Sequence, residues 1–369
     1  MRVAIFHNYM DNIGGAEITA LTLARELKAD VYTTNLDADK IEHAGFSDVA
    51  IREISRVPVR APYKQQATLA RFLALHLPGA YDFFVIDGDW AMSAALRNRP
   101  NLWYVHSPIR EIYDLYEYTR GNQNNFVRRA IFDLWVALNR IINRRLFRYV
   151  DRVVCNSENT RKRVRRYLRG SSEVVYPPVD TKEFHYRRNG DFWLSVNRLF
   201  EHKRVELQCE AFASLPSERL VVVGSHEETR HSTEYARHLN QTKPPNVEMA
   251  GWVDPEELTG LYADCKAFIT TSYEEDFGLT PVEAMASGKP VIAPNEGGYR
   301  ESVIDGVTGI LIDKMTAGSL ASAVTILGPV AGRYKGACLE RAQKFDKEVF
   351  ARGIRRCMEA CLSVRAARK

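Results

Sequence analysis

Two glutamates eight positions apart, Glu275 and Glu283, lie in the most informative segment of the chain. The segment runs from Ser272 to Ala293 and predicts a strand, a loop, a helix, a turn and a second strand. Thr280-Pro281-Val282-Glu283 has the form of a capping box with proline at the first helical position, so a helix should begin there with its amide groups directed into the loop. Such a helix end can hold an anion such as a pyrophosphate, and Glu275 can accept hydrogen bonds from sugar hydroxyls. Taken alone, the residues fit a helix cap and a solvated loop glutamate better.

Two cations, Arg198 and Lys203, follow another expected strand, Phe192–Val196. Charge-assisted contacts from such side chains are well suited to an anionic ligand. Either residue alone could be a surface cation on a loop. Both together with the glutamate pair favour a binding site for a ligand that carries anionic and hydroxyl groups.

The N-terminal half contains weaker signals of the same kind. Gly14 and Gly15 follow the first expected strand, and paired glycines let a backbone come close to a ligand before a helix starts. A flexible turn explains them equally well. His106 follows the expected strand Leu102–Val105, but a single histidine is most often structural.

Short apolar runs alternate with helical patterns through the chain, which is typical of α/β domains with parallel sheets covered by helices on both faces. A proline pair in Tyr176–Asp180 ends regular structure and predicts domains at 1–178 and 179–345. Parallel sheets bind ligands beyond the carboxyl ends of their strands, where the residues above fall. The other expected strands are Val3–His7, Val31–Thr33, Phe83–Asp87, Arg152–Cys155, Glu173–Tyr176, Leu220–Val223, Val247–Met249, Ala267–Thr271, Pro290–Ala293 and Ile310–Ile312, with helices at Ala16–Leu27 and Glu158–Leu168.

The glutamate segment resembles the E-x₇-E donor motif of the retaining glycosyltransferases of family 4, and the match continues through Gly297-Gly298 and Glu301. The resemblance covers nearly the whole chain. It implies the GT-B fold, in which two Rossmann-like domains face each other across a cleft and the final segment, 346–369, forms a helix that crosses back to the first domain.

The resemblance also assigns roles to individual residues. Glu275 would contact the transferred sugar and Glu283 the nucleotide ribose, while Arg198 and Lys203 would neutralise the diphosphate. Asn197 stands where the family usually has glycine, and His202-Lys203-Arg204 replaces a Lys-Gly pair. His106 would reach the donor sugar. The remaining expected donor-binding residues are Gly14, Gly15, Gly224, Ser225, Val253, Phe277, Gly278, Leu279 and Thr280.

The Glu-Asp-Phe-Gly form of the motif is similar to that of GDP-mannose-dependent members. The sequence therefore predicts retaining transfer of an α-mannosyl group from GDP-mannose to a glycan or lipid-linked glycan. A UDP-sugar-dependent glucosyl, galactosyl or N-acetylglucosaminyl transferase is the alternative, and a non-catalytic nucleotide- or membrane-binding protein is an alternative of another class. No G-x-G-x-x-G follows a strand, which argues against an NAD-linked oxidoreductase, and no nucleic-acid module is recognisable.

No metal or other cofactor is expected. Asp87-Gly88-Asp89 spells the D-x-D of metal-dependent glycosyltransferases, but that motif belongs to a different fold, in which a divalent cation bridges the diphosphate. In this family Arg198, Lys203 and a helix terminus can stabilise the leaving group. Asp87 and Asp89 are therefore expected to be turn or acceptor-side residues.

Residues 120–169 contain fourteen arginines and lysines but three acids, which predicts a basic surface for an anionic partner. An apolar stripe runs through the same segment at helical spacing, beside an i,i+4 ladder of Arg140, Arg144 and Arg148. The pattern fits either a core helix with a solvated basic face or an interfacial helix on anionic lipid. The family resemblance favours peripheral membrane contact through residues 126–169. The stripe comprises Val127, Ile131, Leu134, Leu138, Ile141 and Ile142.

The composition fits a cytoplasmic protein. A length of 369 residues accommodates about two domains. Six cysteines without C-x-x-C pairs are expected to be reduced and buried. No run approaches the ~20 apolar residues of a membrane span, and Met1–His7 is too short for a signal peptide. The expected location is the cytoplasm, extending to the cytoplasmic face of a membrane.

Overall fold

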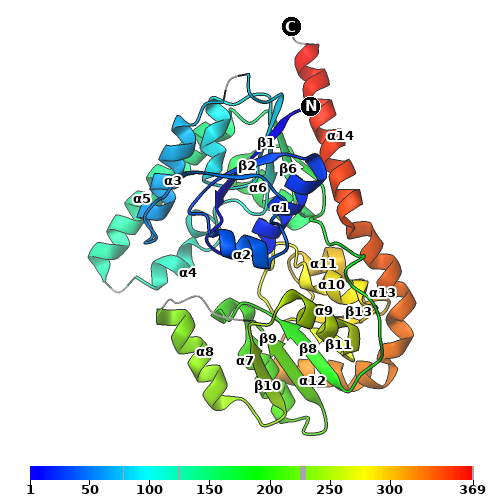
Figure 1. Ribbon diagram of the computed structural model, residues 1–369. Helices are drawn as coiled ribbons and strands as arrows, with labels where there is room; N and C mark the ends of the chain where they lie inside the picture. Colours follow the sequence, from blue (N-terminus) through cyan, green and yellow to red (C-terminus); the bar gives the residue numbers. More distant parts are fainter. Residues whose placement is uncertain (78, 124, 225–229, 368–369) are drawn as a thin grey trace. The chain divides into compact units, whose positions relative to one another are not determined.

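The chain forms two compact units, which we describe separately. A computed structural model describes residues 1–77, 79–123, 125–224 and 230–367 (Figure 1). Unit 1 comprises Met1–Tyr176 and Phe350–Lys369, and unit 2 comprises Pro177–Val349. The sequence places the corresponding boundaries after residues 178 and 345.

Unit 1 is built on a seven-stranded sheet in the order β3-β2-β1-β4-β5-β6-β7, in which every neighbouring pair is parallel. The sequence pattern missed β3, because this strand lies at an edge of the sheet and carries polar residues at three of its five positions. The strands are β1 (Val3–Tyr9), β2 (Asp30–Thr34), β3 (Ile51–Ser55), β4 (Phe83–Ile86), β5 (Asn101–Val105), β6 (Arg152–Cys155) and β7 (Glu173–Val174).

Helices connect these strands, and two apolar clusters form the core of unit 1. Both predicted helices are present, with α6 at the predicted bounds and α1 one residue longer. The helices are α1 (Gly15–Leu27), α2 (Ala38–His43), α3 (Tyr63–Ala74), α4 (Tyr116–Gly121), α5 (Phe126–Phe147) and α6 (Glu158–Leu168).

The last helix, α14 (Lys347–Ala366), supplies one side of the unit 1 core (Figure 1). Phe350, Ile354 and Met358 recur at helical spacing, and each is at most 1% exposed. They belong to the same cluster as Ile5 of β1. The core of unit 1 is therefore completed by a helix that comes more than 170 residues after the last strand of its sheet.

Unit 2 contains a six-stranded parallel sheet in the order β10-β9-β8-β11-β12-β13. Helices connect consecutive strands, as the alternating pattern predicts. The strands are β8 (Phe192–Val196), β9 (Arg219–Val223), β10 (Val247–Gly251), β11 (Ala267–Ile269), β12 (Val291–Pro294) and β13 (Gly309–Ile312); the helices are α7 (Val205–Ala213), α8 (Arg230–Thr242), α9 (Pro255–Asp264), α10 (Thr280–Ala286), α11 (Tyr299–Ser302), α12 (Ala317–Leu327) and α13 (Lys335–Ala342).

The strand orders fix where ligands can bind. In an open parallel sheet, the connections on either side of the switch in strand order leave in opposite directions and open a crevice at the carboxyl ends of the strands. The switch falls between β1 and β4 in unit 1 and between β8 and β11 in unit 2. The loops after these four strands are the first places to seek function.

The chain enters and leaves unit 2 through two segments that are paired with each other. The Val179 amide donates to the Phe345 carbonyl at 2.9 Å, and the Lys347 amide donates to the Val179 carbonyl at 3.0 Å. The Thr181 hydroxyl donates to the buried Asp346 carboxylate at 2.5 Å. The two connecting segments are thus tied together at the edge of unit 2.

All six cysteines are free and buried, as predicted. Within the part of the chain that the structure describes, no helix is both long and apolar enough to cross a bilayer.

Phe350→Ala should lower the free energy of unfolding of unit 1 by about 3–5 kcal/mol, because the substitution leaves a cavity where α14 meets the core. Urea denaturation would measure the effect. Val364→Ala is the matched control, since Val364 lies on the same helix and is 49% exposed; its effect should stay within about 0.5 kcal/mol. Equal effects of the two substitutions would contradict the packing role of α14.

Candidate functional site

Two loops meet at the switch point of the unit 2 sheet, one after β8 and one after β11. The Tyr273 amide donates to the His202 carbonyl at 2.8 Å. The Thr271 hydroxyl contacts the carbonyls of Lys203 and Arg204 at 2.7 and 3.0 Å. The predicted residues Arg198, Lys203 and Glu275 therefore lie on two loops that are bonded to each other.

Glu275 and Lys203 form an ion pair in this loop pair. The Lys203 ammonium lies 2.5 Å from Glu275 Oε2, and the Ser272 hydroxyl donates to the same oxygen at 2.6 Å. Burial alone would raise the pKa of Glu275, but the Lys203 charge, the two hydrogen bonds and His202 outweigh it and lower the pKa to about 2. Glu275 is therefore a carboxylate at neutral pH, able to accept hydrogen bonds but not to donate a proton.

A pair of glycines fixes the backbone turn that carries Glu275. The Gly298 amide donates to the Glu275 carbonyl at 2.8 Å. A β-carbon on Gly297 would lie 2.5 Å from that carbonyl oxygen, and one on Gly298 would lie 2.4 Å from Phe277 Cα. Gly297 also has a φ of +57°, which side chains disfavour. No other residue type fits this close contact between the loops.

Arg204 braces the same loops, and the sequence analysis gave it no role. Its guanidinium donates to the Thr271 carbonyl at 2.6 Å and forms an ion pair with Glu296 at 2.6 Å. Its φ of +52° lies in the left-handed region, which explains why the related motif has glycine at this position. Arg204 stands where the related motif has the glycine of its Lys-Gly pair, and this substitution was the signal that could have identified it.

Arg198 lies on the loop after β8 and is exposed, with its guanidinium carbon 5.5 Å from the centre of the Phe200 ring. Because the side chain is exposed, an anionic ligand can contact it without the charge first being taken out of water. Arg198 and Lys203 thus place two positive charges on one loop, and Lys203 is paired with the Glu275 carboxylate.

The predicted capping box at Thr280 is wrong. The helix α10 begins at Thr280, but its N-cap is Leu279, without a side-chain cap bond. Glu283 instead accepts a hydrogen bond from the Tyr262 hydroxyl at 2.7 Å, because its carboxylate is directed at α9 rather than back along its own helix. Burial raises the pKa of Glu283 to about 7. The hydrogen bond from Tyr262 opposes this rise, and the charge of Glu183 adds to it.

The other predicted donor-binding residues lie on the loops of the same sheet edge. The Gly224 amide, after β9, donates to the Gly251 carbonyl at the end of β10 at 2.7 Å, and Val253 follows half-buried. Phe277 is buried against Phe345, with ring centres 5.3 Å apart. Gly278, Leu279 and Thr280 continue that turn into α10. Ser225 lies outside the described residues.

Three predicted residues, Gly14, Gly15 and His106, belong to unit 1. Gly14 is the extended N-cap of α1, and its amide donates to the Glu17 carboxylate at 2.9 Å. His106 directly follows β5, and its side chain is 21% exposed. All three positions lie at the carboxyl edge of the unit 1 sheet, near its switch point.

Asp87, predicted to be a turn or acceptor-side residue, also lies at this edge. It is fully buried and contacts His7 and His106 at 3.0 Å each. A D-x-D spacing does not reveal this, because the partners come from β1 and from the loop after β5. Two histidines that lie within or directly after expected strands, His7 and His106, were the available signal.

The fold and the site define a glycosyltransferase. The family model described as Glycosyltransferase Family 4 matches residues 13–183, and the one described as Glycosyl transferases group 1 matches residues 180–327. The chain belongs to glycosyltransferase family 4 and has the GT-B fold.

Individual relatives agree with this assignment. The chain is 29% identical to the alpha-1,3/1,6-mannosyltransferase ALG2 of Dictyostelium discoideum over 380 residues, which cover 84% of this chain and 86% of that protein. The solved structure of Anabaena HepE in complex with UDP matches 98% of this chain and 100% of its own, with a TM-score of 0.77 and 19% identity. Sucrose-phosphate synthase from Thermosynechococcus elongatus gives the same coverage and TM-score at 20% identity.

Glu283→Gln should stabilise the protein above pH 7 and have little effect near pH 4. The raised pKa means that the folded state retains a proton that the unfolded chain, with a pKa of about 4.3, has lost. Wild-type stability therefore falls, relative to the variant, as the pH rises from about 4 to about 7. Melting temperatures across this range measure the difference. Glu340→Gln, at an exposed glutamate of α13, should show no such trend; a pH-independent difference for Glu283→Gln would refute the raised pKa.

Proposed function

We propose that this glycosyltransferase moves an α-mannosyl group from GDP-mannose to a glycan or lipid-linked glycan, with retention of anomeric configuration. The ion pair between Lys203 and Glu275 at the switch point of the unit 2 sheet, with Arg198 exposed on the same loop as Lys203, is the observation that carries the proposal. The 29% identity to a mannosyltransferase over 84% of the chain supports the choice of sugar.

The proposed roles follow from charge. As the donor breaks, negative charge develops on the departing nucleoside diphosphate, and fixed cations stabilise it. Arg198 and Lys203 would supply this positive charge. Glu275, ionised and held by Lys203 and Ser272, would accept hydrogen bonds from hydroxyls of the transferred sugar.

Glu283 would hold the ribose of the nucleotide. Its pKa near 7 lets it accept a hydrogen bond from a ribose hydroxyl when ionised. The remaining loop residues would contact the donor through their backbones, as the family resemblance implies. In unit 1, His106 would act on the donor sugar, and Gly14 and Gly15 would approach the diphosphate.

A UDP-sugar-dependent transferase remains the second candidate. The similar HepE structure is a complex with UDP, and a likeness of fold does not distinguish the nucleotide base. Both candidates share the same cations and carboxylates, so they differ in donor and not in the catalytic arrangement.

Donor binding tests the proposal. GDP-mannose and GDP should raise the melting temperature more than UDP-glucose, UDP-N-acetylglucosamine or UDP, because a ligand that binds only the folded state stabilises it. Arg198→Ala should weaken this binding by about tenfold or more, the effect of losing a hydrogen bond between charged groups. Glu275→Ala should abolish transfer. We expect transfer to persist in excess EDTA, since no metal is proposed.

Arg333→Ala is the matched control, because Arg333 is an exposed arginine of unit 2 outside the loops described. It should bind donor as the wild type does. Stabilisation by uridine nucleotides alone would replace the GDP-mannose proposal with the UDP-sugar candidate. No binding of any nucleotide would favour a non-catalytic protein.

We also propose that α5 of unit 1 brings the enzyme to a membrane that carries its acceptor, at the cytoplasmic face. The helix packs against the core through Phe132, Trp135 and Val136, but these are not the residues of the predicted apolar stripe. Its apolar stripe is largely exposed, as for Ile131 at 64% and Leu134 at 62%, while Asn139 and Asn143 are among the buried residues. Phe126, at the start of the helix, is 81% exposed. Ile142, which we included in the stripe, is instead half-buried.

The basic residues of this segment divide into two groups. Some hold the fold together: Arg140 donates to the Ile112 carbonyl and Arg163 is buried with Ser107, so the predicted arginine ladder is only partly exposed. Others remain on the surface of the two helices and could meet anionic headgroups. The exposed ones are Arg128, Arg129, Arg144, Arg145, Arg148, Arg161, Lys162, Arg165, Arg166 and Arg169.

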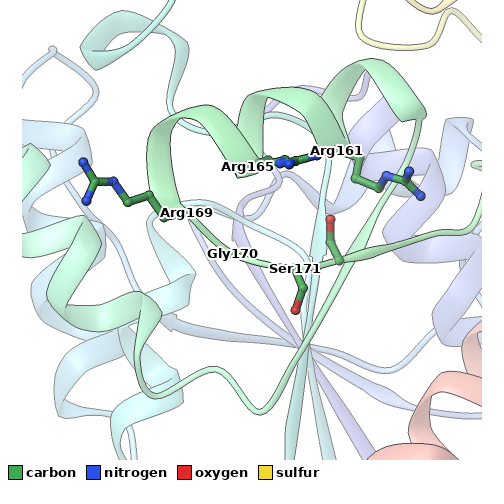
Figure 2. A pocket seen from close by; sticks show the side chains of 6 residues that line it. Arg161, Arg165, Arg169, Gly170 and Ser171 are labelled. Carbon is green, nitrogen blue, oxygen red and sulfur yellow. The ribbon is translucent and has the colours of Figure 1, made fainter.

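One hollow of about 520 Å³ lies among these exposed arginines (Figure 2). Arg161, Arg165 and Arg169 recur every fourth residue along α6 and the residue that ends it, and Ser171 and Ser172 complete the lining. Gly170 lies against the Phe147 ring at the end of α5, so the two helix ends adjoin. A lipid phosphate would find arginine and hydroxyl donors together here.

The double substitution Ile131→Ser/Leu134→Ser should reduce binding to vesicles of anionic lipid by at least about tenfold, because each buried aliphatic side chain contributes about 1.5–3 kcal/mol. Co-sedimentation at low salt measures binding, and high salt should weaken it by screening the arginines. Ile326→Ser is the control, since Ile326 is an exposed isoleucine of unit 2 at 66%. Failure of the wild-type protein to bind would remove the membrane proposal.

A further inference from the structure

A buried carboxylate joins two histidines at the switch point of the unit 1 sheet. Asp87 Oδ2 lies 3.0 Å from His7 Nδ1, and Asp87 Oδ1 lies 3.0 Å from His106 Nε2. Asp87 is 0% exposed and His7 is 3% exposed. A carboxylate this deeply buried needs partners for both oxygens, and the two imidazole rings supply them.

The same chain of hydrogen bonds reaches the glycine loop. His7 Nε2 lies 3.3 Å from Glu17 Oε1, and the other oxygen of Glu17 accepts from the Gly14 amide at 2.9 Å. An unbroken path therefore runs from Gly14 through Glu17, His7 and Asp87 to His106. It crosses the ends of three strands, β1, β4 and β5.

The backbone around Asp87 is built to hold this position. Gly88 follows Asp87, and a β-carbon there would lie 2.4 Å from the Asn8 side chain. That side chain, in β1, accepts from the Trp90 and Ala91 amides at 3.0 and 2.9 Å. The close contact fixes the turn after β4 against β1, and it directs Asp87 toward the histidines. Packing therefore explains Asp87 and Gly88 of the D-x-D sequence.

The protonation of the rings follows from their partners. Both nitrogens of His7 face carboxylates, so both carry protons; burial alone would lower the pKa of His7, but Asp87 and Glu17 raise it to about 10. His106 contacts a carboxylate through Nε2 alone, which assigns the proton to that nitrogen and leaves Nδ1 to act on a ligand.

We infer that Asp87 is a positioning residue for His106: it fixes the ring and the Nε2 proton, and with His7 and Glu17 it keeps His106 in register with the glycine loop. The inference rests on the proposed function, in which His106 acts on the donor sugar. His7 contributes the charge that lets Asp87 remain ionised at this depth, because the two form a neutral buried pair.

Asp87→Asn tests the inference, because asparagine keeps the volume but can accept from only one of the two protonated rings. We expect kcat to fall roughly 10–100-fold, the usual effect of removing a carboxylate that orients a histidine, while the donor KM changes by no more than about twofold. In a His106→Gln background the same substitution should have no further effect on kcat, because Asp87 acts through His106. A further drop in that background would overturn the inference.

Asp151→Asn is the matched control for a purely structural carboxylate in unit 1. Asp151 pairs with Arg99 and accepts from the Asn101 amide at 3.0 Å, at the opposite end of β5. The control should lower the melting temperature without changing kcat. An equal loss of kcat in this variant would show that Asp87→Asn acts through general destabilisation.

Nuclear magnetic resonance of histidine-labelled protein gives a readout that needs no substrate. The chain has nine histidines, and His106→Gln identifies the His106 signals. The charged groups that face His106 are Asp87, His7 and Asp89, and Asp87 raises its pKa against the effects of burial and of His7. Asp87→Asn should lower the pKa of His106 and release its Nε2 proton; an unchanged titration would overturn the inference.

These readouts separate the inference from the proposed function. If the wild type transfers no sugar but the His106 titration responds to Asp87→Asn, the buried network stands and the proposed function fails. If transfer proceeds fully in His106→Gln, the positioning role for transfer is overturned, while the donor proposal is left to the binding experiment.

Discussion

The ion pair between Lys203 and Glu275 is the interaction on which the two loops of the candidate site in unit 2 depend. A half-buried carboxylate is costly unless a cation and hydrogen-bond donors compensate it. Lys203 and Ser272 do so, and they come from the loops after β8 and β11. The pair can form only because parallel strands deliver both loops to one edge of the sheet. The glycine pair after β12 and the Arg204 brace then hold the turn that keeps Glu275 in place.

Each unit contains a carboxylate that is partly or fully removed from water, and different residues compensate its charge in the two units. In unit 1 the buried carboxylate is Asp87 and its compensating groups are two histidines, again from loops or strand ends at the switch point. In unit 2 the compensating cation is a lysine that a ligand phosphate could also contact. The difference suits the proposed roles, because a buried carboxylate between two histidines orients a ring, whereas a partly exposed lysine and an exposed arginine can contact a diphosphate.

Sequence patterns predicted the elements well where side chains were apolar and poorly where they were polar. The core strands and α6 follow from short apolar runs and from helical periodicity. The edge strand β3 was missed because more than half of its residues are polar. The predicted capping box at Thr280 does not form, because Glu283 accepts a hydrogen bond from Tyr262 on another helix. The apolar stripe of α5 has the same period whether it faces the core or solvent, so periodicity could not determine its exposure.

The sequence by itself determined the class of fold and the family, and it selected Arg198, Lys203, Glu275 and Glu283 as the proposed donor-site residues, because these depend on local order along the chain. Only the tertiary structure determined which groups meet: that Lys203 neutralises Glu275, that Glu283 is held by Tyr262, and that Asp87 joins His7 to His106. Each of these contacts joins residues that are at least 19 positions apart in the sequence. Their pKa values and roles depend on burial and on partners that the folded sheet brings together, which is information that no single segment contains.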